Sequence, residues 1–381
     1  MKKKIFYWSP CLNPVGTVIS TINSAKALSK YNKNFEVFIV NSCGEWDRYM
    51  KDFSENNVKL IDLTFNYFKF LPKTGYLGSR FSYIIIFLIS FIPLLKLIKK
   101  EEPEFLIAHL ITSLPLTLLN IFSFKTEIIL RISGFPKLNF IRKYFWKNIS
   151  KKLKMITCPT LELKSNLETK KIFPNNKLFY LPDAILEIKK IPILKKSDTI
   201  KKFPENKKII LAAGRLTKQK NFSYLIDEFK DFLIINDEYL LYIIGEGEER
   251  EKLEKKIKNN KLIDKVFLLG HKKNVYSYMQ KSEVFVLSSL WEEVGFVIVE
   301  ASVNNLYVIA SDCPNGPKDF LNKGENGILF KSNVKGEILN SLIKYNQLTF
   351  EKKFFDKLKL KMNSKKFTKF NHYKKIKNLL I

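Results

Sequence analysis

The stretch Ser288-Ser-Leu-Trp-Glu-Glu-Val-Gly-Phe-Val-Ile-Val-Glu-Ala-Ser302 carries the clearest signal of the fold. An apolar, β-rich run at 284–287 precedes it, and apolar residues at helical spacing begin near Phe296. The order is therefore strand, acidic loop with a glycine, and helix. An open α/β sheet presents functional groups in this way at the carboxyl ends of its strands.

Two carboxylates stand eight positions apart in this stretch, Glu292 in the loop and Glu300 in the helix. Glu300 lies between Val299 and Ala301 in an otherwise apolar segment. A carboxylate in such surroundings either finds a hydrogen-bonding partner or costs several kcal/mol in lost solvation. A ligand that carries hydroxyl groups would supply the partner, whereas a pair of solvated surface carboxylates is the simpler alternative.

The same alternation of strand and helix recurs along the chain and predicts an α/β protein with two Rossmann-like, doubly wound parallel sheets. Between 186 and 207, lysines, prolines and short apolar residues replace the strand pattern, and we interpret this part as a linker. The predicted domains are therefore 1–185 and 208–364. The last helix, about 365–381, is expected to pack back on the first domain.

The formal charge of +29 is large and comes mostly from lysine. An anionic membrane surface, nucleic acid or a general compositional bias could explain it. Nucleic-acid readers favour arginine, which is scarce here, and no nucleic-acid-binding motif is found. We therefore expect no nucleic-acid partner and keep membrane and bias as the two explanations.

The four cysteines are widely separated and have neither metal-ligand nor redox spacing, which favours a reduced, cytoplasmic protein. The basic start at Met1 has no apolar run of signal-peptide length and predicts a first strand instead.

A basic loop follows the first strand of the second domain. The strand ends at Gly214, Arg215 and Lys220 follow, and a helical pattern resumes near Phe222. Cations beside the start of a helix would bind a diphosphate well, although basic loop residues are often only solvated. Gly245 and Gly247 end the next strand, but the third glycine of a dinucleotide fingerprint is missing.

These motifs together resemble retaining nucleotide-sugar glycosyltransferases of family 4, of the type that builds bacterial envelope polysaccharide and lipopolysaccharide. Glu292 and Glu300 match the family's two glutamates, and Gly295 and Phe296 match its usual Gly-Phe pair. The segment that holds Arg215 and Lys220 is similar to the Gly-Arg-Leu motif with its downstream lysine. The resemblance covers roughly 208–331 closely and the first half less closely. It implies a GT-B fold, in which two domains face a cleft.

The resemblance also implies roles for the donor-side residues. Arg215 and Lys220 would stabilise the leaving diphosphate, Glu292 would bind the donor sugar, and Glu300 the ribose hydroxyls. Further donor contacts are implied at Gly214, Gly245, Gly247, Gly295, Phe296 and Val297. The implied reaction retains the anomeric configuration by front-face substitution and needs no metal or other cofactor.

Two candidate residues lie in the first domain. His109 ends a predicted strand at a point where the family often has a histidine that faces the donor sugar. Gly16 precedes a helix whose first residues suit a phosphate, but the family often has two glycines here and this chain has one. A lone histidine is more often structural than catalytic.

The segment 81–98 is the most hydrophobic part of the chain and contains Pro93. With about 15 uncharged residues it falls short of the roughly 20 that span a bilayer. A buried helix and a helix lying in the membrane interface are the alternatives, and the basic flanks suit the second.

The expected function is transfer of a sugar from a nucleoside-diphosphate donor, UDP favoured over GDP. The acceptor would be a lipid-linked or lipopolysaccharide-type glycan. The expected location is the cytoplasm, peripheral on the inner face of the cytoplasmic membrane. A non-catalytic sugar-binding subunit of a membrane assembly and a nucleotide-sugar epimerase of the same fold are the alternatives.

Overall fold

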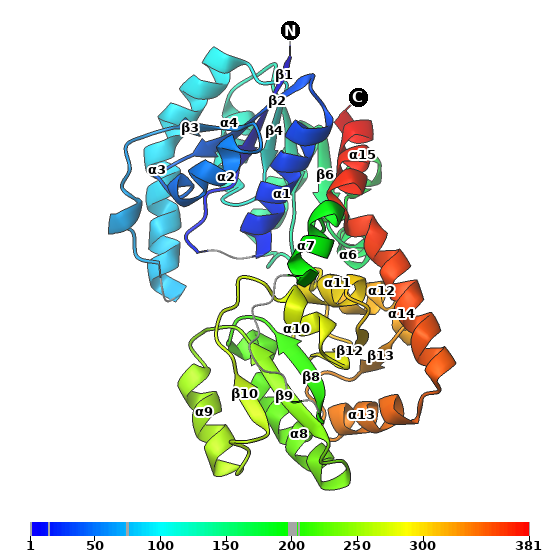
Figure 1. Cartoon of the computed structure of the whole chain (residues 1–381). Helices are drawn as coiled ribbons and strands as arrows, with labels where there is room; N and C mark the ends of the chain where they lie inside the picture. Colours follow the sequence, from blue (N-terminus) through cyan, green and yellow to red (C-terminus); the bar gives the residue numbers. More distant parts are fainter. Residues whose placement is uncertain (1, 14–15, 74–75, 197–203, 205, 381) are drawn as a thin grey trace. The chain divides into compact units, whose positions relative to one another are not determined.

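The computed structural model describes residues 2–13, 16–73, 76–196, 204 and 206–380. The chain forms two compact units, and the polypeptide passes between them twice. Unit 1 contains Met1–Ala184 and Lys369–Ile381, and unit 2 contains Ile185–Thr368. Figure 1 shows both units, with labels on most of their helices and strands.

Unit 1 is built on a seven-stranded parallel sheet in the order β3-β2-β1-β4-β5-β6-β7. Its central strands are almost wholly apolar because helices cover both faces of a parallel sheet. The strands are β1 (Lys3–Trp8), β2 (Phe35–Asn41), β3 (Val58–Asp62), β4 (Phe105–Ala108), β5 (Glu127–Arg131), β6 (Met155–Cys158) and β7 (Leu178–Tyr180).

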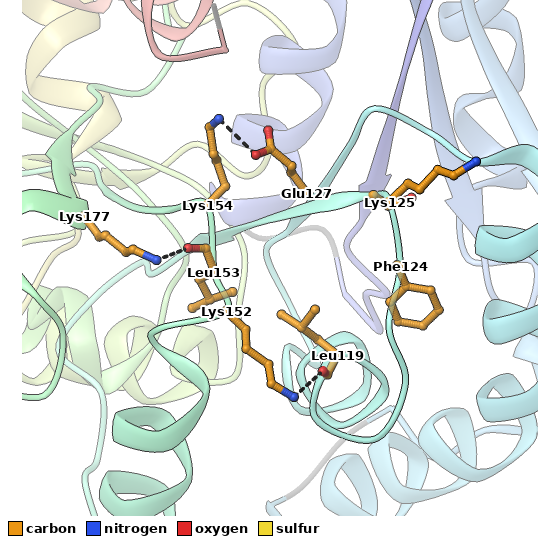
Figure 2. A pocket seen from close by; sticks show the side chains of 9 residues that line it. Leu119, Phe124, Lys125, Glu127, Lys152, Leu153, Lys154 and Lys177 are labelled. Carbon is orange, nitrogen blue, oxygen red and sulfur yellow. Dashed lines mark hydrogen bonds and ion pairs between the residues drawn. The ribbon is translucent and has the colours of Figure 1, made fainter.

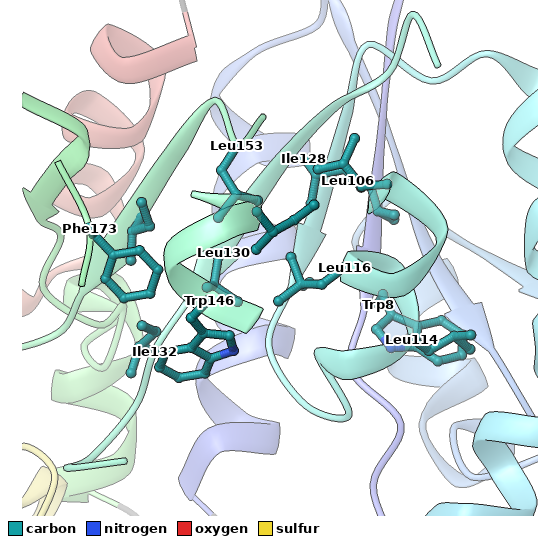
Figure 3. Close-up of a cluster of buried hydrophobic side chains, with 14 of the residues drawn as sticks. Trp8, Leu106, Leu114, Leu116, Ile128, Leu130, Ile132, Trp146, Leu153 and Phe173 are labelled. Atoms are coloured by element: carbon teal, nitrogen blue, oxygen red, sulfur yellow. The ribbon is translucent and has the colours of Figure 1, made fainter. Parts of the chain in front are cut away.

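The helices of unit 1 connect these strands and bury both faces of the sheet. They are α1 (Gly16–Tyr31), α2 (Met50–Ser54), α3 (Tyr76–Glu101), α4 (Ser113–Ile121), α5 (Phe140–Ile149), α6 (Leu161–Thr169) and, from the end of the chain, α15 (Lys369–Leu380). One core cluster packs Leu116 of α4 and Trp146 of α5 with the strand residues Leu106, Ile128 and Leu130 (Figure 3). On the other face α15 packs against α1, and Ile376 and Leu380 of α15 join the core there.

Unit 2 has a six-stranded parallel sheet in the order β10-β9-β8-β11-β12-β13. The strands are β8 (Lys208–Ala213), β9 (Tyr239–Ile244), β10 (Val266–Leu268), β11 (Val284–Leu287), β12 (Tyr307–Ser311) and β13 (Ile328–Phe330). The helices are α7 (Ile191–Lys196), α8 (Phe222–Ile235), α9 (Arg250–Asn259), α10 (Tyr276–Gln280), α11 (Phe296–Val303), α12 (Pro317–Phe320), α13 (Glu337–Gln347) and α14 (Phe350–Ser364). Two parallel doubly wound sheets confirm the predicted fold class.

The boundary between the units differs from the linker predicted at 186–207. Residues 188–196 are helical, and α7 packs against α10 inside unit 2. Leu186 also belongs to the core of unit 2. The mixed lysine and proline composition concealed this short helix, so the sequence placed the start of the second domain too late. The rest of the predicted linker includes 197–203 and 205, which lie outside the described residues.

The apolar segment 81–98 belongs to a longer helix than the sequence suggested. Helix α3 extends over 26 residues, and its length and composition would allow it to cross a membrane. The prediction that this segment is too short was therefore wrong. One face of α3 nevertheless packs into unit 1 through Ile86, Leu94 and Ile98. The opposite side exposes a run of large apolar residues, Leu77, Phe81, Ile84, Leu88 and Ile92.

Candidate functional site

Strands β8 and β11 lie side by side in the sheet of unit 2, although β9 and β10 come between them in the sequence. The connections that follow these two strands therefore leave the sheet in opposite directions, which makes this a topological switch point. Ligands of open α/β sheets bind at such a switch point. The loop after β8 carries Arg215 and Lys220, and the loop after β11 carries Glu292. The topology thus brings together two motifs that are 72 residues apart.

The carboxylate of Glu292 is the centre of this loop pair. The Lys220 ammonium forms an ion pair with its Oε1 atom, and both side chains are mostly buried, 13% and 8% exposed. The Ser289 hydroxyl donates a second hydrogen bond to the same oxygen at 2.6 Å. The Ser288 hydroxyl donates to the Lys220 carbonyl at 2.7 Å and so joins the two loops. Glu292 Oε2 accepts no hydrogen bond from the described residues.

The three glycines at this edge allow two loops to approach each other closely. The Gly214 amide donates to the Ile244 carbonyl at 2.9 Å, and the Leu216 amide donates to Glu246 at 2.9 Å. A side chain at Gly245 would come within 1.8 Å of the Gly214 carbonyl oxygen, and one at Gly247 within 2.4 Å of the Leu216 carbonyl oxygen. Gly245 and Gly247 therefore support the loop that carries Arg215.

Helix α11 begins directly after the acidic loop. Gly295 precedes it with φ +75°, a left-handed conformation that favours glycine. Phe296 and Val297 form the first turn and are half-buried. Glu300 is also half-buried, and no described residue donates a hydrogen bond to its carboxylate. Burial raises the pKa of Glu300 to about 7. This is the unpaired carboxylate that the sequence pointed to.

Arg215 is exposed in the loop after β8, and its guanidinium has no partner among the described residues. It emerges from the same loop as Lys220, one residue after Gly214. The two loops and the start of α11 therefore bring together the unpaired Arg215, the Lys220–Glu292 ion pair and the half-buried, unpaired carboxylate of Glu300. A ligand with an anionic part and a hydroxyl-bearing part matches these groups.

His109 lies at the switch point of unit 1, where β1 and β4 are neighbours. Its backbone amide donates to the Trp8 carbonyl at 2.9 Å, and its Nδ1 atom lies 3.0 Å from the Thr21 hydroxyl of α1. Burial, and secondarily the positive charge of Arg131, holds the pKa of His109 well below its ordinary value. The imidazole is therefore neutral at neutral pH. Gly16 is the exposed first residue of α1.

A second polar network in unit 1 was not predicted. His372 of α15 contacts the Pro182 carbonyl through Nδ1 and the Ser24 hydroxyl through Nε2, both at 2.7 Å. The carbonyl can only accept, so a neutral His372 donates from Nδ1 and accepts from Ser24. Nearby, the buried Arg131 forms an ion pair with Asp183, which also accepts a hydrogen bond from Ser20.

The sequence did carry a signal for this network. Thr17, Ser20, Thr21 and Ser24 are all buried and recur at helical spacing along α1. A polar stripe on the side of a helix that faces a sheet indicates buried hydrogen-bonding partners. Ser288 and Ser289 of unit 2 stand in the quoted acidic stretch itself, but their roles depended on contacts that only the fold reveals.

A cavity of about 410 Å³ lies in unit 1 where β5 and β6 begin (Figure 2). Four lysines line it, and all of them already have partners: Lys154 pairs with Glu127 at 3.0 Å, Lys177 donates to the Leu153 carbonyl, and Lys152 donates to the Leu119 carbonyl. The fourth, Lys125, pairs with Glu102 at 3.1 Å. The cavity lies at the amino edge of the sheet and contains none of the predicted site residues.

The structure thus brings Gly214, Lys220 and Glu292 together in unit 2 and places Arg215 in the same loop. Glu300 lies in helix α11, which begins directly after the acidic loop. Residues 195–362 match the family Glycosyl transferases group 1. The matched segment contains the site residues predicted in the second half of the chain, whereas Gly16 and His109, which were also predicted, lie outside it.

The names of two curated relatives agree with this family match. An uncharacterized glycosyltransferase of Methanocaldococcus jannaschii is 32% identical over 249 residues, which cover 60% of each chain. A Campylobacter jejuni protein is 30% identical over 172 residues, 42% of this chain and 46% of its own. It is named N-acetylgalactosamine-N,N'-diacetylbacillosaminyl-diphospho-undecaprenol 4-alpha-N-acetylgalactosaminyltransferase. The chain thus spans three fifths or less of the length of these two relatives.

Solved structures match the whole fold. A glycosyltransferase from Rickettsia africae has a TM-score of 0.77 at 16% identity and covers 100% of this chain and 98% of its own. Anabaena HepE, solved in complex with UDP and glucose, has a TM-score of 0.73 at 14% identity, with 99% of each chain covered. At this identity the likeness establishes the fold, which is that of the GT-B glycosyltransferases.

Proposed function

We propose that the protein is a retaining glycosyltransferase of family 4 that uses a nucleoside-diphosphate sugar, UDP favoured. The observation that supports this most directly is the group of Arg215, Lys220, Glu292 and Glu300 at the switch point of unit 2. The match of this region to the group 1 glycosyl transferases agrees with it. The UDP bound in the HepE structure favours uridine as the base.

The chemistry required is stabilisation of the negative charge that develops on the leaving diphosphate. Arg215 is unpaired and exposed, so it can contact phosphate oxygens without breaking an existing interaction. Lys220 is already paired with Glu292, and this contact fixes both side chains before a donor binds. Removing one such donor of charge stabilisation typically slows a reaction about 10²–10³-fold.

The two glutamates would bind hydroxyl groups of the donor. Glu292 has one oxygen held by Lys220 and Ser289 and the other free to accept from the sugar. Glu300 would accept from the ribose, and this contact would favour the charged form of its carboxylate. We propose front-face substitution, in which the leaving phosphate accepts the proton of the acceptor hydroxyl, without a metal ion.

The proposed acceptor is a lipid-linked or lipopolysaccharide-type glycan. The diphospho-undecaprenol in the name of the Campylobacter relative supports an acceptor of this class. The exposed apolar residues of α3 and its basic end at Lys99 and Lys100 support a peripheral site on an anionic membrane, at its cytoplasmic face.

Thermal unfolding with millimolar UDP, GDP, ADP and CMP, each with and without magnesium, tests the donor site. A ligand at 100 times its dissociation constant adds about 2.7 kcal/mol, which raises the midpoint by several degrees. We expect UDP to shift the midpoint independently of magnesium, and Arg215→Ala to remove the shift. Arg142→Ala, a surface arginine of unit 1, is the matched control and should respond like the wild type.

The other outcomes separate the alternatives. A shift that requires magnesium would contradict metal independence, and a shift with GDP alone would reassign the donor. No shift with any nucleotide would exclude a nucleotide-sugar site and favour a sugar-binding subunit. Once an acceptor is found, the anomeric configuration of the product, measured by NMR, tests retention.

A further inference from the structure

Helix α14 of unit 2 exposes a continuous apolar stripe. Phe350, Phe354, Leu358 and Met362 follow one another at intervals of four residues and are 78%, 50%, 42% and 56% exposed. Phe355 lies beside them and is 55% exposed. Residues four apart lie on the same side of a helix. These five residues form what we call the α14 stripe.

The stripe is not the side by which α14 packs into unit 2. The buried residues of this helix are Asp356, Leu360 and Ser364, which also follow one another at intervals of four. At 100° per residue the two sets lie on opposite sides of the helix. The helix is therefore apolar toward solvent, the reverse of an ordinary surface helix.

The charges on α14 are almost all positive. The helix contains five lysines and two acidic residues, and Lys365 and Lys366 follow it. One of the acidic residues, Asp356, is buried, forms an ion pair with Lys352 at 2.6 Å and accepts a hydrogen bond from the Tyr307 hydroxyl at 3.0 Å. Lys357, Lys359 and Lys361 have no acidic partner among the described residues.

We propose that the α14 stripe lies on an anionic lipid surface, with Lys357, Lys359 and Lys361 at the headgroups. A solvent-facing row of phenylalanine, leucine and methionine flanked by unpaired lysines is the pattern of a helix that lies in a membrane interface. The lysines favour anionic lipid over a second copy of this chain, because two such basic faces would repel each other.

This surface is distinct from α3, which belongs to unit 1, and it does not depend on the proposed sugar transfer. It has a consequence for the donor site, because α14 packs against α11, the helix that carries Glu300. A membrane bound at the stripe would therefore contact α14, the helix that packs against the helix of this site residue.

A label on the stripe tests the proposal without interference from α3. All four native cysteines are buried, so a single introduced cysteine can be labelled with an environment-sensitive fluorophore. In Leu358→Cys we expect fluorescence to rise about twofold with phosphatidylglycerol-containing vesicles but not with phosphatidylcholine alone. The triple variant Lys357→Gln, Lys359→Gln, Lys361→Gln, carrying the same label, should lower vesicle affinity about a hundredfold.

Ile234→Cys is the matched control. Ile234 is 82% exposed in unit 2, and its charged neighbours in the sequence include one lysine, Lys230, and two aspartates, Asp231 and Asp237, so it lacks the excess of lysines found on α14. Its label should not respond to either vesicle, and both labelled proteins should keep the wild-type unfolding midpoint. Equal signals from the two labels, or none from Leu358→Cys, would overturn the proposal. A rise at Leu358→Cys with protein concentration in the absence of lipid would overturn it in favour of self-association.

Discussion

Glu300 shows how a half-buried carboxylate without a partner among the described residues can lower the stability of the folded protein. Its pKa in the folded state, about 7, lies above the ordinary value of a glutamate. The neutral form is therefore favoured by folding, and stability is lost as the pH rises from about 4.5 toward 7. Above that range the folded protein carries a half-buried charge that no described residue balances.

We therefore expect Glu300→Gln to stabilise the ligand-free protein at pH 8. The gain in free energy of unfolding should be about 2–3 kcal/mol and should vanish below about pH 4.5. Urea denaturation at pH 4.5, 6 and 8 measures it. Glu292→Gln is the contrasting variant and should destabilise the protein, because it breaks the ion pair with Lys220. If Glu300→Gln were less stable than the wild type at pH 8, burial would not be the dominant influence on this carboxylate.

For the residues that we propose for the donor site, the sequence showed chemical types and positions along the sheet, but not contacts. Arg215, Lys220, Glu292 and Glu300 stand at the ends of recognisable strands or starts of helices, so their edge of the sheet was predictable. The Lys220–Glu292 pair was not, because sequence spacing does not show that β8 and β11 are neighbours. The contacts of Asp183 and His372 were not predictable for the same reason, because their partners lie far away in the sequence.

The close contact between the loops after β8 and β9 makes a prediction at the scale of these elements. In Gly245→Ala the new methyl group would clash with the Gly214 carbonyl oxygen, which is backbone and cannot rotate away. We expect a loss of about 2–4 kcal/mol in unfolding free energy, together with a weaker response to UDP. Thermal unfolding with and without the nucleotide measures both effects.

Gly16→Ala is the control for this substitution. Gly16 is the first residue of α1, and beyond its own chain neighbours no atom of the described residues lies within 4 Å of the position that its side chain would occupy. It should therefore cost little stability. A Gly245→Ala protein as stable as Gly16→Ala would mean that the two loops are not in close contact.

At the scale of elements, strands with continuous apolar runs were predictable to within a residue or two, and β11 has the predicted limits, 284–287. Helix α7 was missed because its sequence, Ile191-Pro-Ile-Leu-Lys-Lys196, is short and contains a proline. Tertiary packing against α10, rather than helix propensity, stabilises it. The exposed apolar side of α14 was beyond prediction, and that of α3 was one of two alternatives, because composition does not show which residues a fold leaves uncovered.

The whole chain crosses from unit 1 to unit 2 and back, and the residues that flank both crossings are held in unit 1. Pro182 and Asp183 precede the first crossing, and His372 follows the second. His372 binds the Pro182 carbonyl, and Arg131 binds Asp183. The two sheets were predictable from repeated strand–helix patterns. The contact between Pro182 and His372 was not, because the sequence does not show that the two separate segments of unit 1 lie together.

The buried histidine at this linkage predicts a pH dependence of folding. Burial lowers the pKa of His372 to about 4. The charges of Arg131 and Lys375 also lower this pKa, whereas the Pro182 carbonyl and Asp183 raise it. A folded-state pKa below the unfolded value of about 6.5 means that the unfolded chain binds the proton first. Stability should therefore fall as the pH drops from about 6.5 toward 4. Between pH 6.5 and pH 5 His372 alone should account for about 2 kcal/mol.

His372→Gln tests this through the slope of the unfolding free energy against pH. A loss of stability caused by the substitution itself would be the same at every pH and would leave this slope unchanged. We expect urea denaturation to show a smaller decline between pH 6.5 and 5 than in the wild type, by about 2 kcal/mol.

Other buried groups also contribute to the pH dependence. His109, whose pKa burial also lowers, should account for part of the decline that remains. Burial raises the pKa of Glu45 and gives a contribution of opposite sign, but it is common to both proteins and cancels in the comparison. His271→Gln, at an exposed position of unit 2, should keep the wild-type slope. An unchanged slope in His372→Gln would mean that this histidine can take up a proton in the folded protein, and that the return of α15 to unit 1 does not depend on its neutral form.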